Sequence, residues 1–410
     1  MSELSYLGKL LDGVEVEWKT LEKVLKRTKG TKITAGQMKA LHKDNAPLKI
    51  FAGGKTVAFV DFKDIPEKDI NREPSIIVKS RGIVEFEYYD KPFSHKNEMW
   101  SYHSDNDAIS IKYIYYFLKI NEGYFQKIGG KMQMPQIATP DTDKFEVPIP
   151  CPDNPEKSLA IQAEIVRILD KFTALTAELT AELTAELSMR KKQYNHYRDL
   201  LLSFEEGEVE WKTLGEMGTL IRGKRFVKAD IIPKGVPCIH YGEMYTHYSI
   251  WANRAKSYIS VELASKLRKA SCGDVVFVSA GETIADIGRG TAWLGDEDVV
   301  IHDACFFYKS SLNPKYVAYF SRTNFFHDQI KKSISSGKIS AINAKGFEKV
   351  IIPVPSPEEQ ARIVAFLDKF DTLTSSITEG LPREIELRQK QYEYYRDLLF
   401  SFPKPETASN

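Results

Sequence analysis

The chain has 410 residues, a formal net charge of +1 at pH 7 and 42% hydrophobic residues. This length predicts two or more domains, and the composition is typical of a folded, soluble protein rather than a disordered one. No run of residues approaches the ~20 apolar positions of a membrane span, so we expect no membrane partner.

The first part of the chain predicts a mixed α/β domain over residues 1–152. Its first residues lack the basic and apolar regions of a signal peptide. Runs rich in β-forming residues at 75–79 and 83–88 lie next to glycine or proline, and residues 111–119 have helical periodicity. A final strand then leads into a proline-rich exit at residues 145–152.

A long helix is predicted within residues 153–206, and it contains a tandem repeat. Residues 176–187 read Thr-Ala-Glu-Leu three times. Four residues advance an α-helix by about 6 Å and turn it by about 400°, which is one full turn plus roughly 40°. Each copy therefore shifts whatever follows by a fixed distance and rotation, so we expect a spacer helix. Its spacer positions are Thr176, Leu179, Thr180, Leu183, Thr184 and Leu187.

A second mixed α/β domain is predicted over residues 207–356, with a β-rich run at 273–279 and a helix at 314–320. A second long helical region follows over residues 357–402. Ser356 is expected to cap it, with Pro357 at its first position. Gly380 and Pro382 are expected to kink or restart this helix. Residues 403–410 form a tail.

The segments around these two domains occur twice in the chain. Residues 22–147 and 215–352, between the repeated segments, share little beyond a general style. A repeated frame with variable inserts indicates that the inserts recognise a partner and that the frame holds the inserts in position. The repeated pairs are residues 16–21 and 209–214, 162–172 and 360–370, and 190–204 and 388–402.

Charge is distributed unevenly between the inserts and the rest of the chain. Residues 16–150 hold 22 basic and 18 acidic residues, a balance of +4, and residues 209–357 hold 20 and 14, a balance of +6. The remaining residues hold 15 and 24, a balance of −9. The two basic domains are either ordinary protein surfaces or a pair of surfaces that bind a polyanion.

We find no convincing catalytic or metal-binding set. Residues 53–56 read Gly-Gly-Lys-Thr, but the first glycine of a phosphate-binding loop is replaced by Lys49. Residues 313–316 read Asn-Pro-Lys-Tyr, which favours the start of a helix over a methyltransferase motif. His302 and Asp303 would point to opposite faces of a strand, so we expect a structural or DNA-contacting His302. The four cysteines are far apart, which favours a reduced, cytoplasmic setting.

Basic and polar loops are the remaining candidates for function. Two glycine-lysine loops, near Lys131 and Lys338, precede the last strand of each domain and so occupy matching places. Glycine permits close backbone approach, lysine can reach phosphates, and amide or hydroxyl groups can read base edges. Taken singly, each loop is also typical of a solvated surface. The candidate DNA contacts are Lys79, Arg81, Lys96, Lys131, Gln133, Arg222, Lys224, Arg225, Tyr241, Tyr245, Lys338, Ser340 and Asn343.

The repeated helical segments resemble a known family. The first helical region begins with Gln-x-x-Ile-Val-x-x-Leu-Asp-Lys-Phe, carries the tandem Thr-Ala-Glu-Leu and ends in Tyr-x-x-Tyr-Arg-Asp-Leu-Leu-x-Ser-Phe. This pattern is similar to that of the specificity (S, HsdS) subunits of type I restriction-modification enzymes, most closely the IC group. The resemblance spans the chain, but the inserts match the family only in architecture.

The resemblance implies an α+β fold with an internal pseudo-twofold duplication. Two mixed α/β target recognition domains, residues 1–152 and 207–356, would be separated by two long helices in an antiparallel coiled coil. Each domain would read one half of a split double-stranded DNA target, and the number of tandem repeats would correlate with the unread spacer between the halves.

The resemblance also implies partners and excludes catalysis by this chain. Two modification (M, HsdM) subunits would dock on it and methylate adenine N6 with S-adenosylmethionine, and restriction (R, HsdR) subunits would use ATP and Mg²⁺. The chain itself would hold no cofactor and would act in the bacterial cytoplasm, associated with the nucleoid through DNA. Two alternatives are a protein-interaction scaffold with incidental basic surfaces and an enzyme that acts on nucleic acid.

Overall fold

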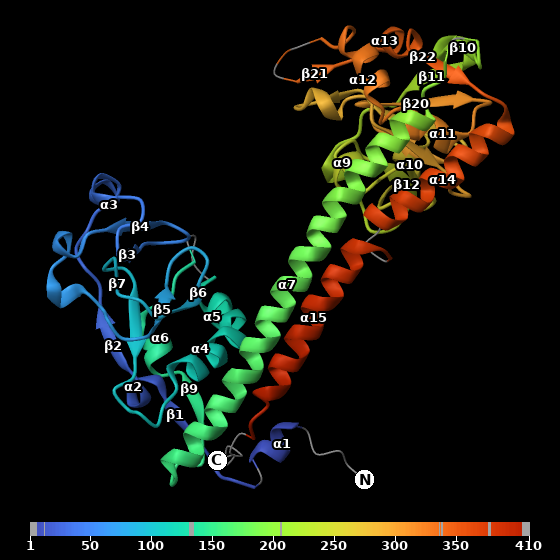
Figure 1. The fold of residues 1–410 in the computed structure, drawn as a ribbon. Helices are drawn as coiled ribbons and strands as arrows, with labels where there is room; N and C mark the ends of the chain where they lie inside the picture. Colours follow the sequence, from blue (N-terminus) through green and yellow to red (C-terminus); the bar gives the residue numbers. More distant parts are fainter. Residues whose placement is uncertain are drawn as a thin grey trace. The chain divides into compact units, whose positions relative to one another are not determined.

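The computed structural model describes residues 6–11, 13–130, 135–205, 207–335, 337, 339–375 and 379–403. The chain divides into two compact units (Figure 1). Unit 1 comprises residues 1–181 and 386–410, and unit 2 comprises residues 182–385. Each unit therefore contains one of the predicted mixed α/β domains together with parts of the long helical regions.

The elements of unit 1 alternate between short strands and short helices before the first long helix. Its strands are β1 (Val16–Thr20), β2 (Lys26–Lys29), β3 (Leu48–Phe51), β4 (Val57–Val60), β5 (Ser75–Lys79), β6 (Glu85–Tyr89), β7 (Phe93–His95), β8 (Trp100–His103) and β9 (Glu146–Pro150). Its helices are α1 (Tyr6–Leu11), α2 (Leu21–Val24), α3 (Ala35–Leu41), α4 (Ile111–Ile120), α5 (Glu122–Gly129) and α6 (Thr139–Asp143), and α7 (Pro155–Leu201) continues into unit 2.

Unit 2 is also built from short strands and short helices. Its strands are β10 (Glu210–Thr213), β11 (Gly218–Arg222), β12 (Val236–Ile239), β13 (Trp251–Ala252), β14 (Ser257–Ile259), β15 (Lys269–Ala270), β16 (Val275–Val278), β17 (Ala280–Gly281), β18 (Gly290–Trp293), β19 (Val299–Ile301), β20 (Cys305–Ser310), β21 (Ser340–Ala341) and β22 (Ile351–Val354). Its helices are α8 (Leu214–Met217), α9 (Glu243–Thr246), α10 (Val261–Ala264), α11 (Pro314–Phe320), α12 (Asn324–Lys331), α13 (Ala344–Glu348) and α14 (Pro357–Ser375), and α15 (Leu381–Leu399) lies mostly in unit 1.

The two inserts contain the same pair of sheets. In unit 1 the strand orders are β2-β8-β5-β6 and β4-β3-β7. In unit 2 they are β11-β20-β16-β18, extended by β13, and β14-β12-β19, extended by β15. In both units one strand of the second sheet, β3 in unit 1 or β12 in unit 2, pairs with one neighbour in antiparallel orientation and with another in parallel orientation. The inserts therefore share a topology that their dissimilar sequences do not reveal, which agrees with the pseudo-twofold duplication implied by the family resemblance.

The larger sheets also match in register. Tyr102 of β8 pairs with Ile76 of β5, and Tyr308 of β20 pairs with Val275 of β16. Both β5 and β16 are buried along their whole length and have a strand on each side. The β-rich runs predicted near residues 75–79 and 273–279 are therefore confirmed as strands of the sheet interior, where continuous apolar sequence is expected.

In each unit a two-stranded sheet is hydrogen-bonded to one helix. β1 pairs with β9, and β10 pairs with β22, so that Trp18 faces Pro148 and Trp211 faces Pro353. The helix, α4 or α11, carries a tyrosine whose hydroxyl donates to that proline's carbonyl oxygen, at 2.8 Å in unit 1 and 3.0 Å in unit 2. These two hydroxyls belong to Tyr113 and Tyr316.

The same helix is joined to the long helical region by a three-residue contact that also occurs twice. An aspartate of α7 or α14 accepts one hydrogen bond from a lysine and one from a tyrosine of α4 or α11. The distances are 2.7 and 2.6 Å in unit 1 and 2.8 and 2.7 Å in unit 2. We call this contact the aspartate clamp; its members are Lys112, Tyr116 and Asp170 in unit 1, and Lys315, Tyr319 and Asp368 in unit 2.

The long helices pack in antiparallel pairs within each unit. In unit 1 the ring of Phe172 on α7 stacks on Tyr395 of α15, with centroids 5.7 Å apart, and earlier residues of α7 share a core with Leu399. In unit 2 Tyr197 near the end of α7 contacts Phe370 of α14, also at 5.7 Å. The predicted antiparallel helix pairing is confirmed by these contacts.

The second long helical region is broken where glycine and proline were expected to break it. α14 begins at Pro357, and the backbone N–H of Glu359 donates to Ser356 Oγ at 3.3 Å. It ends at Ser375, and α15 begins at Leu381, after Gly380 in the left-handed region with φ 81°. Glycine adopts this conformation without the steric cost of a Cβ, so the predicted restart is confirmed.

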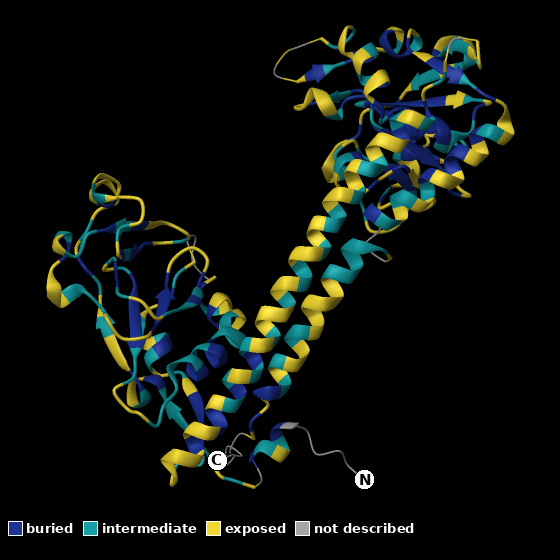
Figure 2. Cartoon of the chain, in the orientation of Figure 1, coloured by how far each residue is buried: buried dark blue, intermediate teal, exposed yellow. Residues whose placement is uncertain are grey.

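The boundary between the units lies inside the tandem repeat. On α7 the division falls between Ala181 and Glu182, and on α15 it falls between Ile385 and Glu386. Figure 2 shows exposed and half-buried residues alternating along α7 here. Of the spacer positions, Thr176, Leu179, Thr180, Leu183 and Leu187 are half-buried, as is Glu186, whereas Thr184 is exposed. The repeat thus occupies the part of α7 that connects the two units.

Candidate nucleic-acid interface

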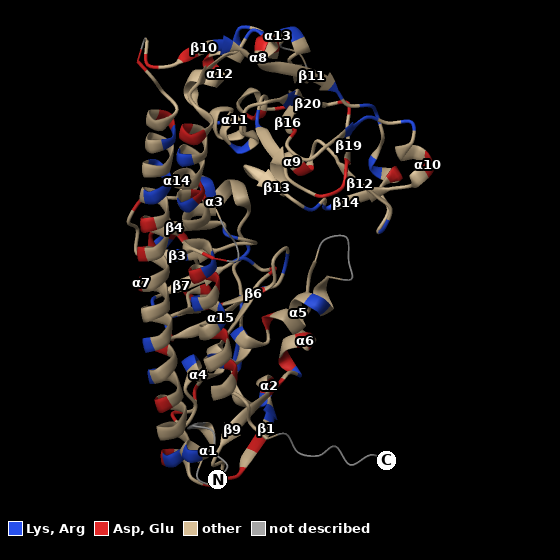
Figure 3. Cartoon of the chain, turned by 90° about the vertical axis from the view of Figure 1, so that its right-hand side faces the viewer, with Lys and Arg blue, Asp and Glu red and all other residues tan. Residues whose placement is uncertain are grey.

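Three of the predicted loops of unit 2 surround one cavity of about 580 Å³. They are the basic loop after β11, the loop after β12 and the segment that leads into β21. Figure 3 shows lysines and arginines on the segments between β11 and α10 of this unit. The cavity is lined by Arg225, Tyr241, Tyr245, His302, Asp303 and Ile339, among others.

The basic loop leaves one guanidinium available to a ligand. Arg222 Nε donates to the carbonyl oxygen of Asp303 at 2.8 Å, and Lys224 Nζ donates to that of Lys266 at 2.9 Å. Arg225 is exposed, and within the described part of the chain no hydrogen bond or ion pair holds its side chain. Of the three predicted basic contacts, Arg225 is therefore the freest to bind an anion.

Aromatic rings form one wall of this cavity. The ring of His302 lies 4.7 Å from that of His240, 5.1 Å from Tyr241 and 5.1 Å from Phe226, centroid to centroid. Burial lowers the pKa of both histidines below its ordinary value. The imidazoles are therefore neutral at neutral pH, and the wall offers flat faces with polar edges, which suits contact with bases.

His302 and Asp303 do not form a catalytic pair, but the reason differs from the expected one. β19 ends at Ile301, so the two residues follow the strand instead of lying on its opposite faces. Their side chains approach to 3.2 Å, from His302 Nδ1 to Asp303 Oδ1. However, Nδ1 also accepts a hydrogen bond from the backbone N–H of Ala304 at 3.1 Å. A nitrogen that accepts in this way carries no proton to share with the carboxylate.

The two predicted tyrosines have different surroundings. The Tyr245 hydroxyl donates to the carbonyl oxygen of Ala280 at 3.0 Å, and burial raises its pKa well above the ordinary value. Tyr241 is 38% exposed and reaches the cavity with its ring. Tyr245 therefore positions the loop after β12, while Tyr241 presents a side chain to a ligand.

The loop before the last strand of unit 2 is only partly described. Lys338 lies outside the described residues. Ser340 is buried in β21, opposite Gly281 of β17, and Asn343 caps α13 by accepting from the backbone N–H of Gly346 at 2.9 Å. These contacts favour structural roles for both predicted base-reading residues, while the neighbouring Ile339 is 62% exposed and lines the cavity.

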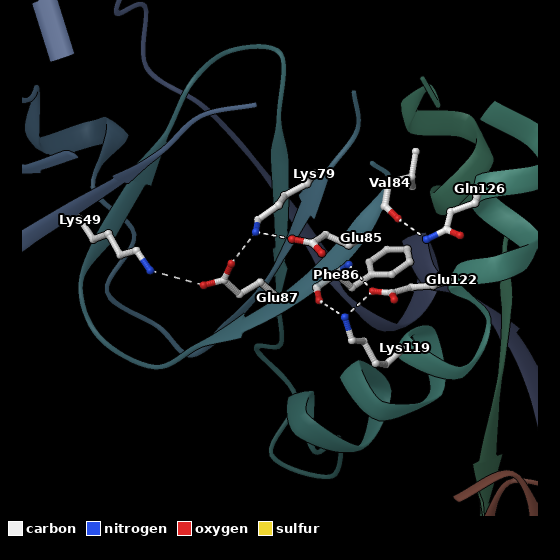
Figure 4. Close-up of polar contacts among 9 residues, drawn as sticks. All are labelled: Lys49, Lys79, Val84, Glu85, Phe86, Glu87, Lys119, Glu122 and Gln126. Atoms are coloured by element: carbon white, nitrogen blue, oxygen red, sulfur yellow. Dashed lines mark hydrogen bonds and ion pairs between the residues drawn. The ribbon is translucent and has the colours of Figure 1, made fainter. Parts of the chain in front are cut away.

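In unit 1, Lys79 lies within a cluster of carboxylates. Figure 4 shows its ammonium between Glu85 and Glu87 of β6, with Lys49 on the other side of Glu87. The two distances from Nζ are 2.5 and 2.8 Å, and the side chain is 9% exposed. Burial alone lowers the pKa of this ammonium, but the hydrogen bonds to Glu85 and Glu87 outweigh it and raise the pKa. Lys79 is thus charged and neutralised within the protein.

The other predicted contacts of unit 1 are divided between paired, exposed and undescribed residues. Lys96 Nζ forms an ion pair with Glu98 at 2.7 Å, whereas Arg81 is exposed. Lys131 and Gln133 lie outside the described residues. The residues after the two glycine-lysine loops do make equivalent bonds: Ile137 donates to the carbonyl of Ser80 at 3.0 Å, and Ile342 to that of Ser279 at 2.9 Å. The residues that follow the two loops therefore occupy matching places, whereas the loop lysines lie outside the described residues.

Sequence reasoning overlooked a basic loop in unit 1. Residues 29–32 read Lys-Gly-Thr-Lys and line a cavity of about 810 Å³. The available signal was its likeness to residues 222–225, which read Arg-Gly-Lys-Arg: a basic residue, a glycine and a basic residue three positions after the first. Both segments also lie close behind the repeated residues 16–21 and 209–214.

The buried His95 beneath this loop is expected to make the stability of unit 1 depend on pH. Its ring Nε2 lies 3.1 Å from Ser101 Oγ, and burial lowers its pKa to about 4. Between pH 6.5 and 4 the unfolded chain binds a proton that the folded unit does not, so stability falls as the pH falls through this window. From pH 7 to pH 5 the loss is about 2 kcal/mol.

This loss can be measured by urea denaturation at pH 7 and pH 5. In the variant His95→Gln the difference between the two pH values should be smaller by about 2 kcal/mol. Comparing differences removes any direct effect of the substitution on stability. An equal pH dependence in both proteins would show that His95 is not responsible.

Within the described ranges, no three His, Cys, Asp or Glu side chains are grouped so that they could hold a metal ion. All four cysteines, Cys151, Cys238, Cys272 and Cys305, are free thiols. The described helices include none that is long and apolar enough to cross a membrane. The features that stand out are thus the cavities and their basic and aromatic walls.

Comparison with known proteins identifies the family. The model of the type I restriction modification DNA specificity domain matches residues 15–189 and 206–387. The chain is 42% identical to the Escherichia coli type I restriction enzyme EcoR124I/EcoR124II specificity subunit, with 100% of both chains covered. It is 36% identical to the Escherichia coli EcoprrI specificity subunit, covering 92% of this chain and 93% of the relative.

Solved structures support the same fold. A structure described as the basis of complex assembly and conformational transition of the type I R-M system matches with a TM-score of 0.60 at 15% identity, over 94% of this chain and 97% of that one. The HsdS subunit from Thermoanaerobacter tengcongensis matches with a TM-score of 0.50 at 14% identity, over 94% and 96%. The chain belongs to the family of type I restriction-modification DNA specificity proteins and is the specificity component, rather than a catalytic component, of such a system.

Proposed function

We propose that each unit of this noncatalytic specificity subunit reads one half of a bipartite double-stranded DNA target. The observation that carries the proposal is the duplicated topology, in which the same two sheets support different loops. Two scaffolds of the same topology can approach two half-sites in the same way. Their different loop side chains suit half-sites of different sequence. The target recognition domains are residues 1–152 and 207–356.

In unit 2 the cavity walls supply the chemistry that DNA recognition needs. Arg225 offers an available positive charge to a phosphate, and Tyr241 offers a ring and a hydroxyl to a base edge. Arg222, Lys224 and Tyr245 are proposed to hold these loops in place through their bonds to backbone carbonyls. Contacts from Lys131, Gln133 and Lys338 stay predictions.

We propose that two modification subunits bind the repeated frame, one on each unit. Each unit has a cavity beside its frame tryptophan, of about 710 Å³ at Trp18 and about 590 Å³ at Trp211. The repeated segments also supply Phe402 to the first cavity and Phe204 to the second. Two similar aromatic-lined cavities suit two copies of one partner that inserts an apolar anchor.

The reactions then belong to the partners. In this proposal the modification subunits methylate adenine N6 with S-adenosylmethionine, and the restriction subunits use ATP and Mg²⁺. The helical regions, residues 153–206 and 357–402, set the separation of the half-sites. The complex acts on DNA in the bacterial cytoplasm, at the nucleoid.

The test is the methylome of cells that carry the whole system. We expect a split motif with one modified adenine in each half and an unread spacer of constant length. Cells that carry the partner genes without this chain are the control and should lack the motif. A continuous motif, or an identical motif in the control, would contradict the proposed function.

A further inference from the structure

We propose that the loop Lys29-Gly30-Thr31-Lys32 is the phosphate-binding loop of unit 1, equivalent to the basic loop Arg222–Arg225 of unit 2. This assignment rests on the proposed function, because it names the residues with which unit 1 would hold its half of the DNA target. Lys79, another predicted contact of unit 1, is less suited to this role because its charge is neutralised inside the protein.

The two loops follow equivalent strands. β2 is the edge strand of its sheet and pairs with β8, and β11 is the edge strand of its sheet and pairs with β20. Lys29 pairs with Trp100, two residues before Tyr102, and Arg222 pairs with Phe306, two residues before Tyr308. Because Tyr102 and Tyr308 occupy the same place in their sheets, Lys29 corresponds to Arg222 and Lys32 to Arg225.

A glycine sets the path of both loops in the same way. A Cβ on Gly30 would collide with the carbonyl oxygens of His95 and Lys96, and a Cβ on Gly223 would collide with those of Ile301 and His302. Only glycine permits so close an approach of two backbones. The loop backbone is therefore held against the segment that follows β7 in unit 1 or β19 in unit 2. The residues after the glycine lie beside that segment.

Backbone hydrogen bonds fix the position of the residues that follow the glycine. In unit 1 the N–H of Thr31 donates to the carbonyl oxygen of His95 at 2.7 Å. In unit 2 the N–H of Lys224, the equivalent residue, donates to that of Ile301 at 3.1 Å. Thr31 is buried whereas Lys32 is exposed, so the bond at Thr31 holds the backbone and Lys32 extends away from it.

The charges of this loop are available, unlike those of Lys79. Lys29 and Lys32 are exposed, and among the residues that the structure describes no hydrogen bond or ion pair holds either ammonium. The cavity of about 810 Å³ beside them also contains Lys68, as well as Arg27, which forms an ion pair with Asp143 at 3.2 Å. Its acidic lining residues are Asp64 and Asp69, so basic groups outnumber acidic ones. A phosphate backbone fits this balance.

The experiment measures how DNA binding by the full chain depends on salt. The probe is a fluorescein-labelled duplex that carries the bipartite target read from the methylome, and binding is followed by anisotropy between about 50 and 200 mM NaCl. The variant is Lys29→Gln/Lys32→Gln. Its control is Lys23→Gln/Lys127→Gln, which removes two exposed lysines of unit 1 that do not line the cavity.

We expect the slope of log K against log salt to fall in magnitude by about 1 per lysine, and so by about 2 in the double variant. Affinity should fall to the same extent on the target and on a scrambled duplex, because phosphates carry no sequence. The control should keep the slope of the parent protein, and Arg225→Gln in unit 2 should lower it by about 1.

The outcomes separate this inference from the proposed function. An unchanged slope in Lys29→Gln/Lys32→Gln, together with a reduced slope in Arg225→Gln, overturns the inference and leaves the proposed function standing. An affinity loss restricted to the target duplex, with the slope unchanged, also overturns the phosphate assignment. A parent protein that binds target and scrambled duplexes equally would instead count against the proposed function.

Discussion

Deletion of residues 180–183, one copy of the tandem repeat, is expected to shorten the unread spacer of the DNA target by one base pair and to leave both half-sites unchanged. The deletion removes about 6 Å and about 400° of helix, which is equivalent to a rotation of roughly 40°. One base pair of B-DNA turns by about 34–36°, so the rotation suits a one-pair step, although the rise exceeds that of one pair. The unit boundary between Ala181 and Glu182 places this change between the two units.

The methylation motif of cells carrying the deleted chain measures this effect directly. Insertion of one further Thr-Ala-Glu-Leu copy should lengthen the spacer by one pair. A length-preserving control is Glu182→Gln, which alters an exposed side chain of the repeat and should leave the motif as it was. The spacer interpretation fails if the deleted chain methylates the original motif, or if either half-site changes.

The second large effect is expected at the aspartate clamp of unit 2. The substitution Asp368→Ala should lower the free energy of unfolding by about 3 kcal/mol, because Lys315 and Tyr319 lose their common acceptor in a half-buried contact. The clamp joins α11 to α14, so amide hydrogens of these two helices should exchange faster. Urea denaturation and hydrogen exchange of the full chain measure the two consequences.

The duplication supplies a matched comparison for this clamp. Asp170→Ala should have a smaller effect in unit 1, because the Asp170 side chain is 39% exposed whereas that of Asp368 is 32% exposed. Glu262→Ala removes the partner of Lys266 in an exposed surface pair and should change stability by less than about 0.5 kcal/mol. Equal losses in Asp368→Ala and Glu262→Ala would show that the clamp adds nothing beyond a surface ion pair.

Local sequence signals predicted the elements that depend on local physics. The cap at Ser356, the proline at 357 and the break at Gly380 were all predictable, because each acts within one turn of helix. The helix at residues 314–320 was predictable for the same reason: Asn313 caps it by accepting from the backbone N–H of Lys315 at 3.0 Å.

Side-chain availability was not predictable in this way. The sequence predicts that Lys79 can reach a phosphate from a loop, but it lies on β5 beside β6, whose residues Glu85 and Glu87 neutralise it. The pairing of two strands decides which charges meet, and a single segment does not contain that information. Likewise, His302 and Asp303 do not lie on a strand as predicted, since β19 ends at Ile301.

By itself, the sequence determined that this chain is a duplicated frame with variable inserts, two long helical regions and a tandem repeat. These features follow directly from the identity between segments far apart in the chain and from helical periodicity. It also pointed to the family that the comparisons confirm. The tertiary structure alone decided that the inserts share one topology, that aspartate clamps join them to the helices, and which of the predicted basic residues are exposed rather than neutralised by carboxylates. These properties depend on strand pairing and burial between residues far apart in the chain, where dissimilar side chains such as Thr31 and Lys224 can occupy the same place.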